Sequence, residues 1–306
     1  VEVTDNEDGS DQQSWIIEVV PAAGTDPDPT PIDDSVATSF PGAVEFLYAG
    51  PNPVQLDVQQ DALVPRRVGV VRGTVLTRDG TPLPGVKVSI LEHPDGGFTL
   101  TRSDGAYDLA ANGGGSITVQ YELDDYLTAQ RRVELPWPQY RTLDPVRLVP
   151  FSPTVTTIDL ARTDAPAALG EVEIDGDGER QGILLFQPGT SAEMALPDGT
   201  LQPLSTMDVR ITEYTVGPNG PEAMPAQLPP TSGYTYAAEF SVDEALAAGA
   251  TRVFFDPAAV FYLDNFLDFP VGTPVPLGGY DRLAGQWEGA SDGIVLQIVG
   301  VNGSGE

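Results

Sequence analysis

Apolar and polar side chains alternate along short stretches between residues 66 and 150, and turn-forming residues separate these stretches. Residues 86–90 read Val-Lys-Val-Ser-Ile, and apolar side chains again recur at every second position over residues 117–121. A period of two places these side chains on one face of a strand and predicts that this face is buried. An Asp-Gly pair at 104–105 and three glycines at 113–115 indicate turns. The chain is therefore predicted to be all-β, with a β-sandwich here.

Composition excludes several classes of function. The 306 residues include 15 basic and 45 acidic side chains, and the formal net charge of -30 argues against nucleic-acid partners, which need basic contacts to the phosphates. The absence of cysteine and the single histidine, His93, exclude disulfides, thiolate metal sites and catalysis by two imidazoles. No apolar run approaches the roughly 20 residues of a spanning helix, so no membrane insertion by this chain is expected.

The remaining residues divide by composition. Residues 1–20 alternate, turn and alternate again like the last hairpin of an upstream immunoglobulin- or cadherin-like repeat, which implies a piece of a larger protein. The predicted segments are that hairpin, a Pro/Asp-rich linker at 21–43, an extended lead-in at 44–65, the sandwich at 66–150, a second β-rich domain at 151–301 and a tail at 302–306.

The second β-rich domain is predicted from further apolar stretches between turns. One short helix is expected, with Asp243 as its cap, good helix formers at 244–248 and Gly249 at its end. The predicted strands are 183–186, 194–196, 209–216, 234–242, 253–255, 260–263 and 294–299.

Two clusters of acidic residues are weak candidates for calcium. Carboxylate oxygens are preferred calcium ligands, but neither spacing completes an EF-hand loop. A solvated turn in an acidic protein is the alternative explanation of both clusters. The candidate ligands are Asp5, Glu7 and Asp8 in the first cluster and Asp175 and Asp177 in the second.

The search for catalytic motifs finds none. His93 precedes Pro94 in a turn-like context, which favours a loop histidine over a base or metal ligand. A nucleophile elbow and a phosphate-binding glycine loop are both missing from the sequence. Among 45 acids, chance pairs of carboxylates carry no information about glycoside hydrolysis. The sequence predicts a protein that is not an enzyme and has no cofactor, calcium aside.

Several aromatic side chains admit two interpretations. They could form a sugar-binding platform or an apolar surface that mates with a larger structure, or they could pack in a core. Trp137 and Tyr140 belong to this set. The candidates for an interface are Phe266, Phe269, Tyr280 and Trp287.

Longer stretches resemble a known family. RGTVLTRDGTPLPGVKVSI (72–90) and TRSDGAYDLAANGGGSITVQY (101–121) resemble the carboxypeptidase regulatory-like module, a transthyretin-like sandwich. Together with QRRVELPWPQY (130–140), they resemble the segment that precedes the YD-repeat shell in bacterial Rhs proteins and their teneurin relatives. FYLDNFLDFPVGTPVPLGGYDRLAGQW (261–287) is similar to the β-rich plug domain of that family.

This resemblance implies a non-enzymatic structural module. The module would plug or scaffold a YD-repeat shell of the same polypeptide, which encloses a C-terminal domain such as a toxin. The protein would be bacterial, and secreted or exposed on the cell surface. The alternative is an extracellular adhesion or carbohydrate-binding tandem of β-sandwiches.

Overall fold

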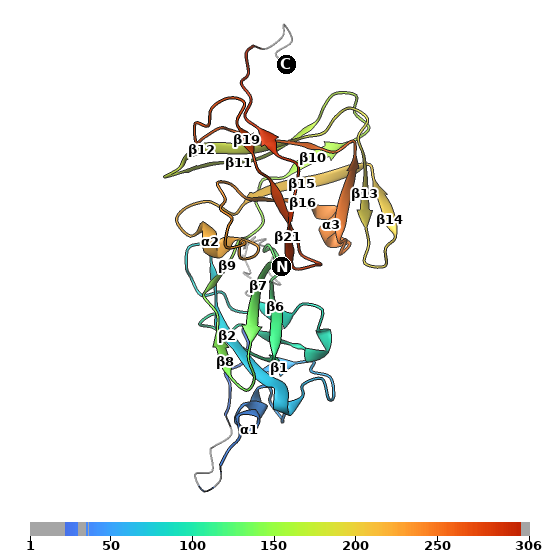
Figure 1. Ribbon diagram of the computed structural model, residues 1–306. Coiled ribbons are helices and arrows are strands. Elements are labelled where there is room, and N and C mark those ends of the chain that lie inside the picture. Colours follow the sequence, from blue (N-terminus) through green and yellow to red (C-terminus); the bar gives the residue numbers. More distant parts are fainter. Residues whose placement is uncertain (1–21, 30–34, 36, 301–306) are drawn as a thin grey trace, which may run out of the picture.

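The computed structural model describes residues 22–29, 35 and 37–300. Figure 1 shows two β-rich regions, the first (residues 37–150) below the second (residues 151–300). Strands dominate both regions and the helices are short, which confirms the all-β prediction. The predicted hairpin at 1–20, with its calcium candidates Asp5, Glu7 and Asp8, lies outside the described residues, as does the tail.

The first region is a β-sandwich of two sheets. One sheet has the order β1-β4-β3-β6-β7 and the other has the order β5-β2-β8, with β9 also pairing with β2. The first sheet consists of β1 (Gln55–Leu56), β3 (Lys87–Ile90), β4 (Phe98–Leu100), β6 (Gly115–Glu122) and β7 (Ala129–Leu135). The second consists of β2 (Val68–Thr77), β5 (Ala106–Asn112), β8 (Tyr140–Thr142) and β9 (Val146–Leu148).

The alternation in the sequence builds the core between these sheets. β3 and β6 pair antiparallel, with Val88 opposite Tyr121 and Ile90 opposite Val119, and all four side chains are buried. Their polar neighbours in sequence point to the other face of the sheet, as a period of two requires. Val71 and Leu109 of the second sheet close the core from the opposite side.

The residues before the sandwich correct the predicted linker and extended lead-in. A short helix, α1 (Phe40–Val44), begins inside the predicted linker and continues into the 3₁₀ helix η1 (Glu45–Leu47). The Ser39 side chain accepts a hydrogen bond from the Gly42 amide at its start. The buried side chains of Val44 and Leu47 pack with Val68 and Val70 of β2 in a second buried cluster, so this lead-in covers the outer face of the second sheet. Two further 3₁₀ turns are η2 (Pro65–Arg67) and η3 (Pro94–Gly96).

The second region contains several small sheets around one core of buried apolar side chains. Its three-stranded sheets have the orders β10-β15-β16, β11-β12-β18 and β14-β13-β17. The strands are β10 (Thr156–Asp159), β11 (Ala167–Asp175), β12 (Gly178–Leu185), β13 (Ser191–Ala195), β14 (Leu201–Leu204), β15 (Thr206–Glu213), β16 (Ala238–Val242), β17 (Arg252–Asp256) and β18 (Val260–Leu263). Two-stranded pairs join β19 (Pro274–Val275) to β22 (Gly293–Ile294) and β20 (Gly278–Asp281) to β21 (Gln286–Gly289). The helices are α2 (Gly220–Ala223) and α3 (Asp243–Ala247).

Several predicted strand boundaries in the second region are wrong because a strand extends only as far as its partner; the strands predicted at 183–186 and 194–196 begin earlier, at Gly178 and Ser191. The strand predicted at 234–242 begins at Ala238, since β15 ends opposite it at Glu213. That partner itself lies at 206–213 rather than at 209–216. The strand predicted at 294–299 pairs only at Gly293–Ile294, because β19 has two residues.

The predicted helix cap is also corrected. Asp243 is the first residue of α3, and its carboxylate pairs with Arg210 at 2.7 Å instead of capping the helix. Gly249 has a φ of +64° just after the helix, which is the conformation expected of a glycine that ends it.

The two buried tyrosines of the sandwich core provide a test of its packing. Their hydroxyl oxygens lie 2.7 Å apart, and burial raises the pKa of Tyr121 to about 12. The variant Tyr121→Phe leaves the Tyr107 hydroxyl buried without its hydrogen-bond partner. We therefore expect the free energy of unfolding to fall by about 1–3 kcal/mol. Urea denaturation measures this loss.

The matched control is the double variant with Tyr107→Phe and Tyr121→Phe. It removes both hydroxyls and should be less destabilised than the sum of the two single variants. Strictly additive losses would contradict the hydrogen bond.

Candidate functional site

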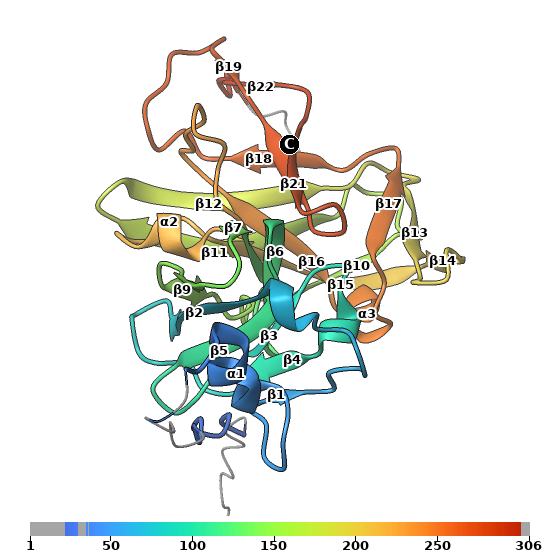
Figure 2. The same cartoon turned by 60° about the horizontal axis from the view of Figure 1, so that its bottom comes forward.

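The two regions meet along an interface, here called the seam, that centres on the Arg131 side chain of β7. Its guanidinium is buried and donates hydrogen bonds to the carbonyl oxygens of Met224 at 3.0 Å and of Glu222 at 2.7 Å. The neighbouring Gln130 amide donates to the Pro225 carbonyl oxygen at 2.7 Å. The open edge of β7 is therefore covered by the segment at α2 of the second region (Figures 1 and 2).

Apolar side chains from both regions fill the rest of the seam. Leu127 and Val149 of the first region pack in one buried cluster with Tyr214 and Met224 of the second. Burial of this cluster removes apolar surface from water, which favours the contact between the regions.

The predicted interface residues Tyr280 and Trp287 also lie at the seam. The Tyr280 hydroxyl donates to Gln130 Oε1 at 2.7 Å, and Trp287 Nε1 donates to the Gln227 carbonyl oxygen at 2.9 Å. The two rings contact each other with their centroids 5.2 Å apart. Both side chains are half-buried, so their polar atoms already have partners within this chain.

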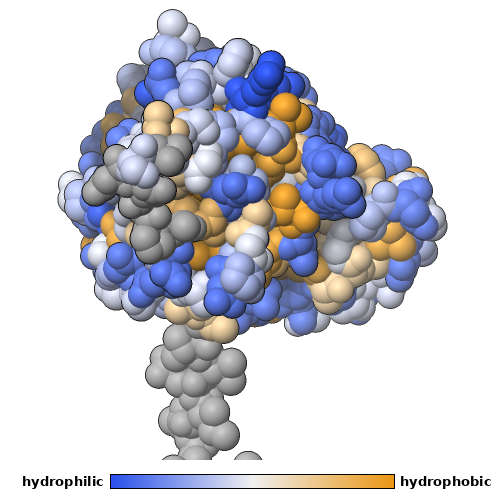
Figure 3. Space-filling view, turned by 90° about the horizontal axis from the view of Figure 1, so that it is seen from below, coloured by the Kyte–Doolittle hydropathy of each residue, from blue (hydrophilic) through white to orange (hydrophobic). Residues whose placement is uncertain are grey.

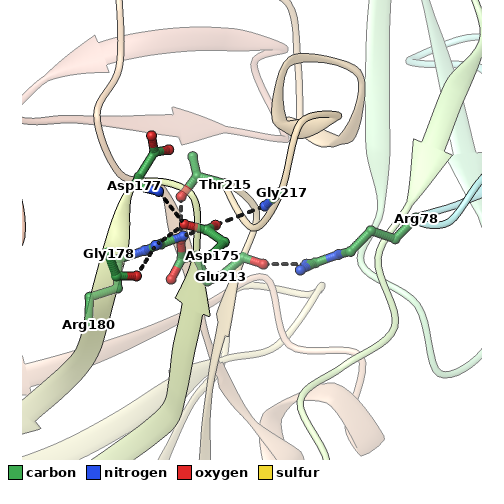
Figure 4. Close-up of polar contacts among 8 residues, drawn as sticks. All are labelled: Arg78, Asp175, Asp177, Gly178, Arg180, Glu213, Thr215 and Gly217. Atoms are coloured by element: carbon green, nitrogen blue, oxygen red, sulfur yellow. Dashed lines mark hydrogen bonds and ion pairs between the residues drawn. The ribbon is translucent and has the colours of Figure 1, made fainter.

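A buried arginine organises the part of the second region next to the seam (Figure 4). The Arg180 side chain on β12 is 1% exposed and reaches the Asp175 carboxylate with two hydrogen bonds, at 2.8 and 2.9 Å. It also lies 2.6 Å from Glu213 Oε1 on β15. Arg180 therefore ties two sheets together through two carboxylates that would otherwise be buried charges.

The second calcium candidate takes part in this network. Besides Arg180, the Asp175 carboxylate accepts hydrogen bonds from the amides of Asp177 and Gly217. The hydrogen bonds of Arg180, followed by that of the Gly217 amide, hold the pKa of Asp175 well below its usual range. Its oxygens thus serve an arginine and two turn amides. Among the described residues, no group of three or more His, Asp or Glu side chains is arranged to hold a metal ion.

One contact links the Arg180 network to the sandwich. Arg78 is the first residue after β2. Its guanidinium donates a hydrogen bond to the Glu213 carbonyl oxygen across the seam (Figure 4). Burial lowers the pKa of Arg78, while the nearby carboxylates of Glu173 and Glu213 oppose this effect. At Glu213 of β15, Arg78 therefore holds the backbone carbonyl oxygen and Arg180 holds the side-chain carboxylate.

The other two predicted interface residues lie in one turn after β18. The Phe266 ring covers the Arg180 guanidinium at 4.8 Å and is half-buried, so it shields the network from water. Phe269 is exposed, and its backbone is held by two hydrogen bonds to the Asn265 side chain. Of these two, only Phe269 presents its side chain to solvent.

An exposed apolar face is the feature that the sequence analysis missed. β11, β12 and β18 form a sheet in which Leu169 lies opposite Ile183 and Ile183 lies opposite Tyr262. A bulge in β11 separates Leu169 from the following residues, and the exposed Val172 and Ile174 continue the row, Ile174 at 71% exposed. The only signal of this face in the sequence is the alternation of apolar and polar residues over 172–175. Such alternation predicts a strand, but it also predicts that the apolar side of the strand is buried. The face consists of Leu169, Val172, Ile174, Ile183, Val260 and Tyr262.

No helix of the described chain is long and apolar enough to cross a membrane.

His93 lies in the loop before η3. The loop position agrees with the structural interpretation of this histidine. It lines a small hollow beside the turn at 113–115 together with Arg67 and Asp95.

Comparison with known proteins accounts for the sandwich. A family model described as the teneurin TTR-like domain matches residues 63–148. Residues 63–148 are thus similar to the transthyretin-like domain of teneurins. Teneurin-3 of Danio rerio is 37% identical over 133 residues, which cover 44% of this chain and 5% of the relative. Teneurin-1 of Homo sapiens is 45% identical over 83 residues, 27% of this chain and 3% of the relative. Teneurin-m of Drosophila melanogaster is 35% identical over 126 residues, 38% of this chain and 4% of the relative.

The teneurin-like and transthyretin-like parts of the predicted resemblance are confirmed by this match. The chain spans about a twentieth of the length of Teneurin-3, and the second region lies outside the matched domain. The Rhs-type shell and the plug remain predictions.

The Arg180 network gives a prediction about stability. Arg180→Met leaves Asp175 and Glu213 without their shared cation, and we expect the free energy of unfolding to fall by about 3–5 kcal/mol. Arg162→Gln is the control, because its ion pair with Asp164 is solvent-exposed and its loss should change little. Equal unfolding midpoints of the two variants in urea would refute the role of Arg180.

The lowered pKa of Asp175 gives a prediction about pH. Because the folded pKa is below that of the unfolded chain, about 3.9, the ionised carboxylate stabilises the fold above about pH 4, and this contribution is lost as the pH falls further. The difference in unfolding free energy between the native chain and Asp175→Asn should therefore shrink between pH 5 and pH 2.5. Thermal unfolding over this range measures it, and a difference independent of pH would contradict the assignment.

Proposed function

We propose that this chain is a non-enzymatic structural module of an Rhs- or teneurin-like protein. Its two regions would act together as a stopper for a YD-repeat shell of the same polypeptide, which encloses a C-terminal domain. We further propose that the protein is secreted or displayed on a bacterial cell surface. The observation that carries the proposal is the teneurin TTR-like match over residues 63–148, joined by the seam to a second β-rich region.

The seam supports a steric mechanism, because a stopper has to be stiff. Arg131 on one side and Arg78 on the other cross between the regions with hydrogen bonds to backbone oxygens. Arg147 of β9 adds an ion pair to Glu222 at 2.5 Å. Opening the seam would leave these guanidinium partners and the cluster around Met224 exposed, so the two regions should move as one body.

The exposed apolar face of β11, β12 and β18 supports contact with a larger structure. Ile174 and Tyr262 are 71% and 45% exposed, and they lie on the same side of one sheet as Leu169 and Ile183. Neighbouring apolar side chains of this kind mark an interaction surface. We therefore assign this face, rather than Phe266, to the contact with the shell.

The buried polar groups support a role without catalysis. Arg180 and Arg131 are saturated by carboxylates and carbonyl oxygens, and the hydroxyls of Tyr107 and Tyr121 bond to each other. These groups stabilise the fold, and their polar atoms point into the protein instead of into a cleft.

Proteolysis of the full-length parent polypeptide tests the proposal. The double variant with Ile174→Asp and Tyr262→Asp places two charges on the apolar face without disturbing buried groups. We expect the C-terminal domain to be cleaved several-fold faster in this variant than in the native protein, because the shell no longer closes. The matched control is Leu56→Asp, which changes an exposed apolar side chain of the sandwich.

Two results would overturn the proposal. One is full protection of the C-terminal domain in the double variant. The other is a downstream reading frame without repeats of the form G-x-x-x-x-x-Y-D-x-x-G-R, which would favour the adhesion alternative.

A further inference from the structure

Four exposed arginines of the sandwich have no acidic partner among the residues that the structure describes. They are Arg66, Arg67, Arg132 and Arg141. In residues 151–300, by contrast, every arginine is in an ion pair with a carboxylate. A chain with 45 acidic and 15 basic residues could neutralise these four easily, so leaving them free requires an explanation.

At least three of these arginines lie around one turn, Gly113–Gly115, between β5 and β6. Arg67 Nη2 donates to the Gly113 carbonyl oxygen at 3.2 Å. Arg132 Nε donates to Ser116 Oγ at 2.9 Å, just after the turn. Arg141 lines a hollow against Gly114 and Gly115, and Arg66 precedes Arg67 in η2. The turn thus sits among positive charges on an otherwise acidic protein.

Two hollows adjoin this turn and share Gly114 and Gly115 in their walls. The larger has a volume of about 330 Å³ and is also lined by Glu134, Pro136 and Arg141. The smaller, of about 230 Å³, has Arg67, His93 and Asp95 in its wall. The larger hollow is shallow and open to solvent, so a ligand there would lie across the surface.

An exposed indole lies beside the larger hollow. Trp137 is 51% exposed, and its Nε1 would be 2.7 Å from a β-carbon at Gly114, so only glycine permits this close approach. Tyr140 is also exposed, and the ring of Phe40 and the guanidinium of Arg72 hold it at 5.1 and 4.0 Å. Trp137 is thereby presented to solvent beside the turn that the free arginines surround, while Tyr140 points to the other face of β8 from Arg141.

We propose that this end of the sandwich binds an oligosaccharide that carries carboxylate or sulfate groups. The indole of Trp137 offers a flat apolar surface with one polar edge, which suits the C–H face of a sugar ring. Arg141 and Arg67 provide the planar donors that pair with carboxylate or sulfate oxygens. The carboxylates of Glu134 and Asp95 accept hydrogen bonds from sugar hydroxyls.

The same two carboxylates argue against a densely charged partner. A nucleic acid presents a phosphate at every step, and the net charge of -30 repels such a polyanion. An acidic oligosaccharide carries hydroxyls on every ring beside its charges, and so matches a site of mixed sign beside an aromatic ring.

The site lies away from the seam. Phe40 belongs to α1 at the lower end of the molecule in Figure 1, and its contact with Tyr140 places β8, which also carries Arg141, near that end. Figure 3 views the molecule from below and shows apolar residues in small areas between hydrophilic ones. Binding here does not depend on the shell proposed above, because the apolar face of β11, β12 and β18 belongs to the other region.

Isothermal titration of the 306-residue chain with defined oligosaccharides tests the proposal. The probes are a hyaluronan hexasaccharide, a hexamer of galacturonic acid, a neutral cellohexaose and a single-stranded DNA hexamer. We expect saturable binding of at least one acidic hexasaccharide, weakened about tenfold or more by Trp137→Ala and by Arg141→Gln, and weakened by added salt.

Arg162→Gln is the control, since it removes one exposed positive charge from the second region and should leave the affinity unchanged. Unchanged unfolding midpoints of the Trp137 and Arg141 variants show that the fold is intact. The proposal is overturned if neither acidic hexasaccharide binds, if cellohexaose or DNA binds as tightly, or if the control lowers the affinity as much as Arg141→Gln.

Discussion

The rest of the structure depends on the burial of guanidinium groups between sheets that would otherwise remain separate. Arg131 satisfies backbone oxygens of the segment at α2, and Arg180 neutralises Asp175 and Glu213 inside the second region. Arg78 then connects the same strand, β15, to the sandwich. A planar cation with five donors can reach several acceptors at once, which lysine cannot do. This property explains why small sheets with few residues each hold together as one molecule.

The few positive charges are arranged differently in the two regions of the molecule, and this difference indicates a different role for each region. In the second region each arginine is used up by an ion pair, so its outer surface is acidic with apolar areas such as the face of β11, β12 and β18. In the sandwich, at least three arginines without an acidic partner among the described residues lie around the turn at 113–115. One end thus suits contact with a large apolar partner, and the other suits a small anionic ligand.

The core of the sandwich and the class of fold were predictable, because side chains at every second position of a strand point to the same face of the sheet. Val88, Ile90, Val119 and Tyr121 are buried as their spacing requires. The same alternation occurs at 172–175, but there the apolar side chains Val172 and Ile174 face solvent. Alternation shows that two faces differ, but it does not show what covers either face. Strand ends were mispredicted for a related reason, since a partner's length is set elsewhere in the chain.

By itself the sequence determined the all-β class and the acidic character, because these follow from local spacing and from composition; the transthyretin-like sandwich came from the resemblance of residues 72–90 and 101–121 to a known family. Only the tertiary structure decided which residues form the seam, that Tyr280 bonds to Gln130 of the sandwich, that Trp287 packs at the seam, and that Asp175 pairs with Arg180. The first two contacts join residues far apart in the chain, and Asp175 meets Arg180 across the hairpin of β11 and β12; the energies of all three depend on burial and distance. Neither quantity exists until the sheets have packed, so no local pattern could contain it.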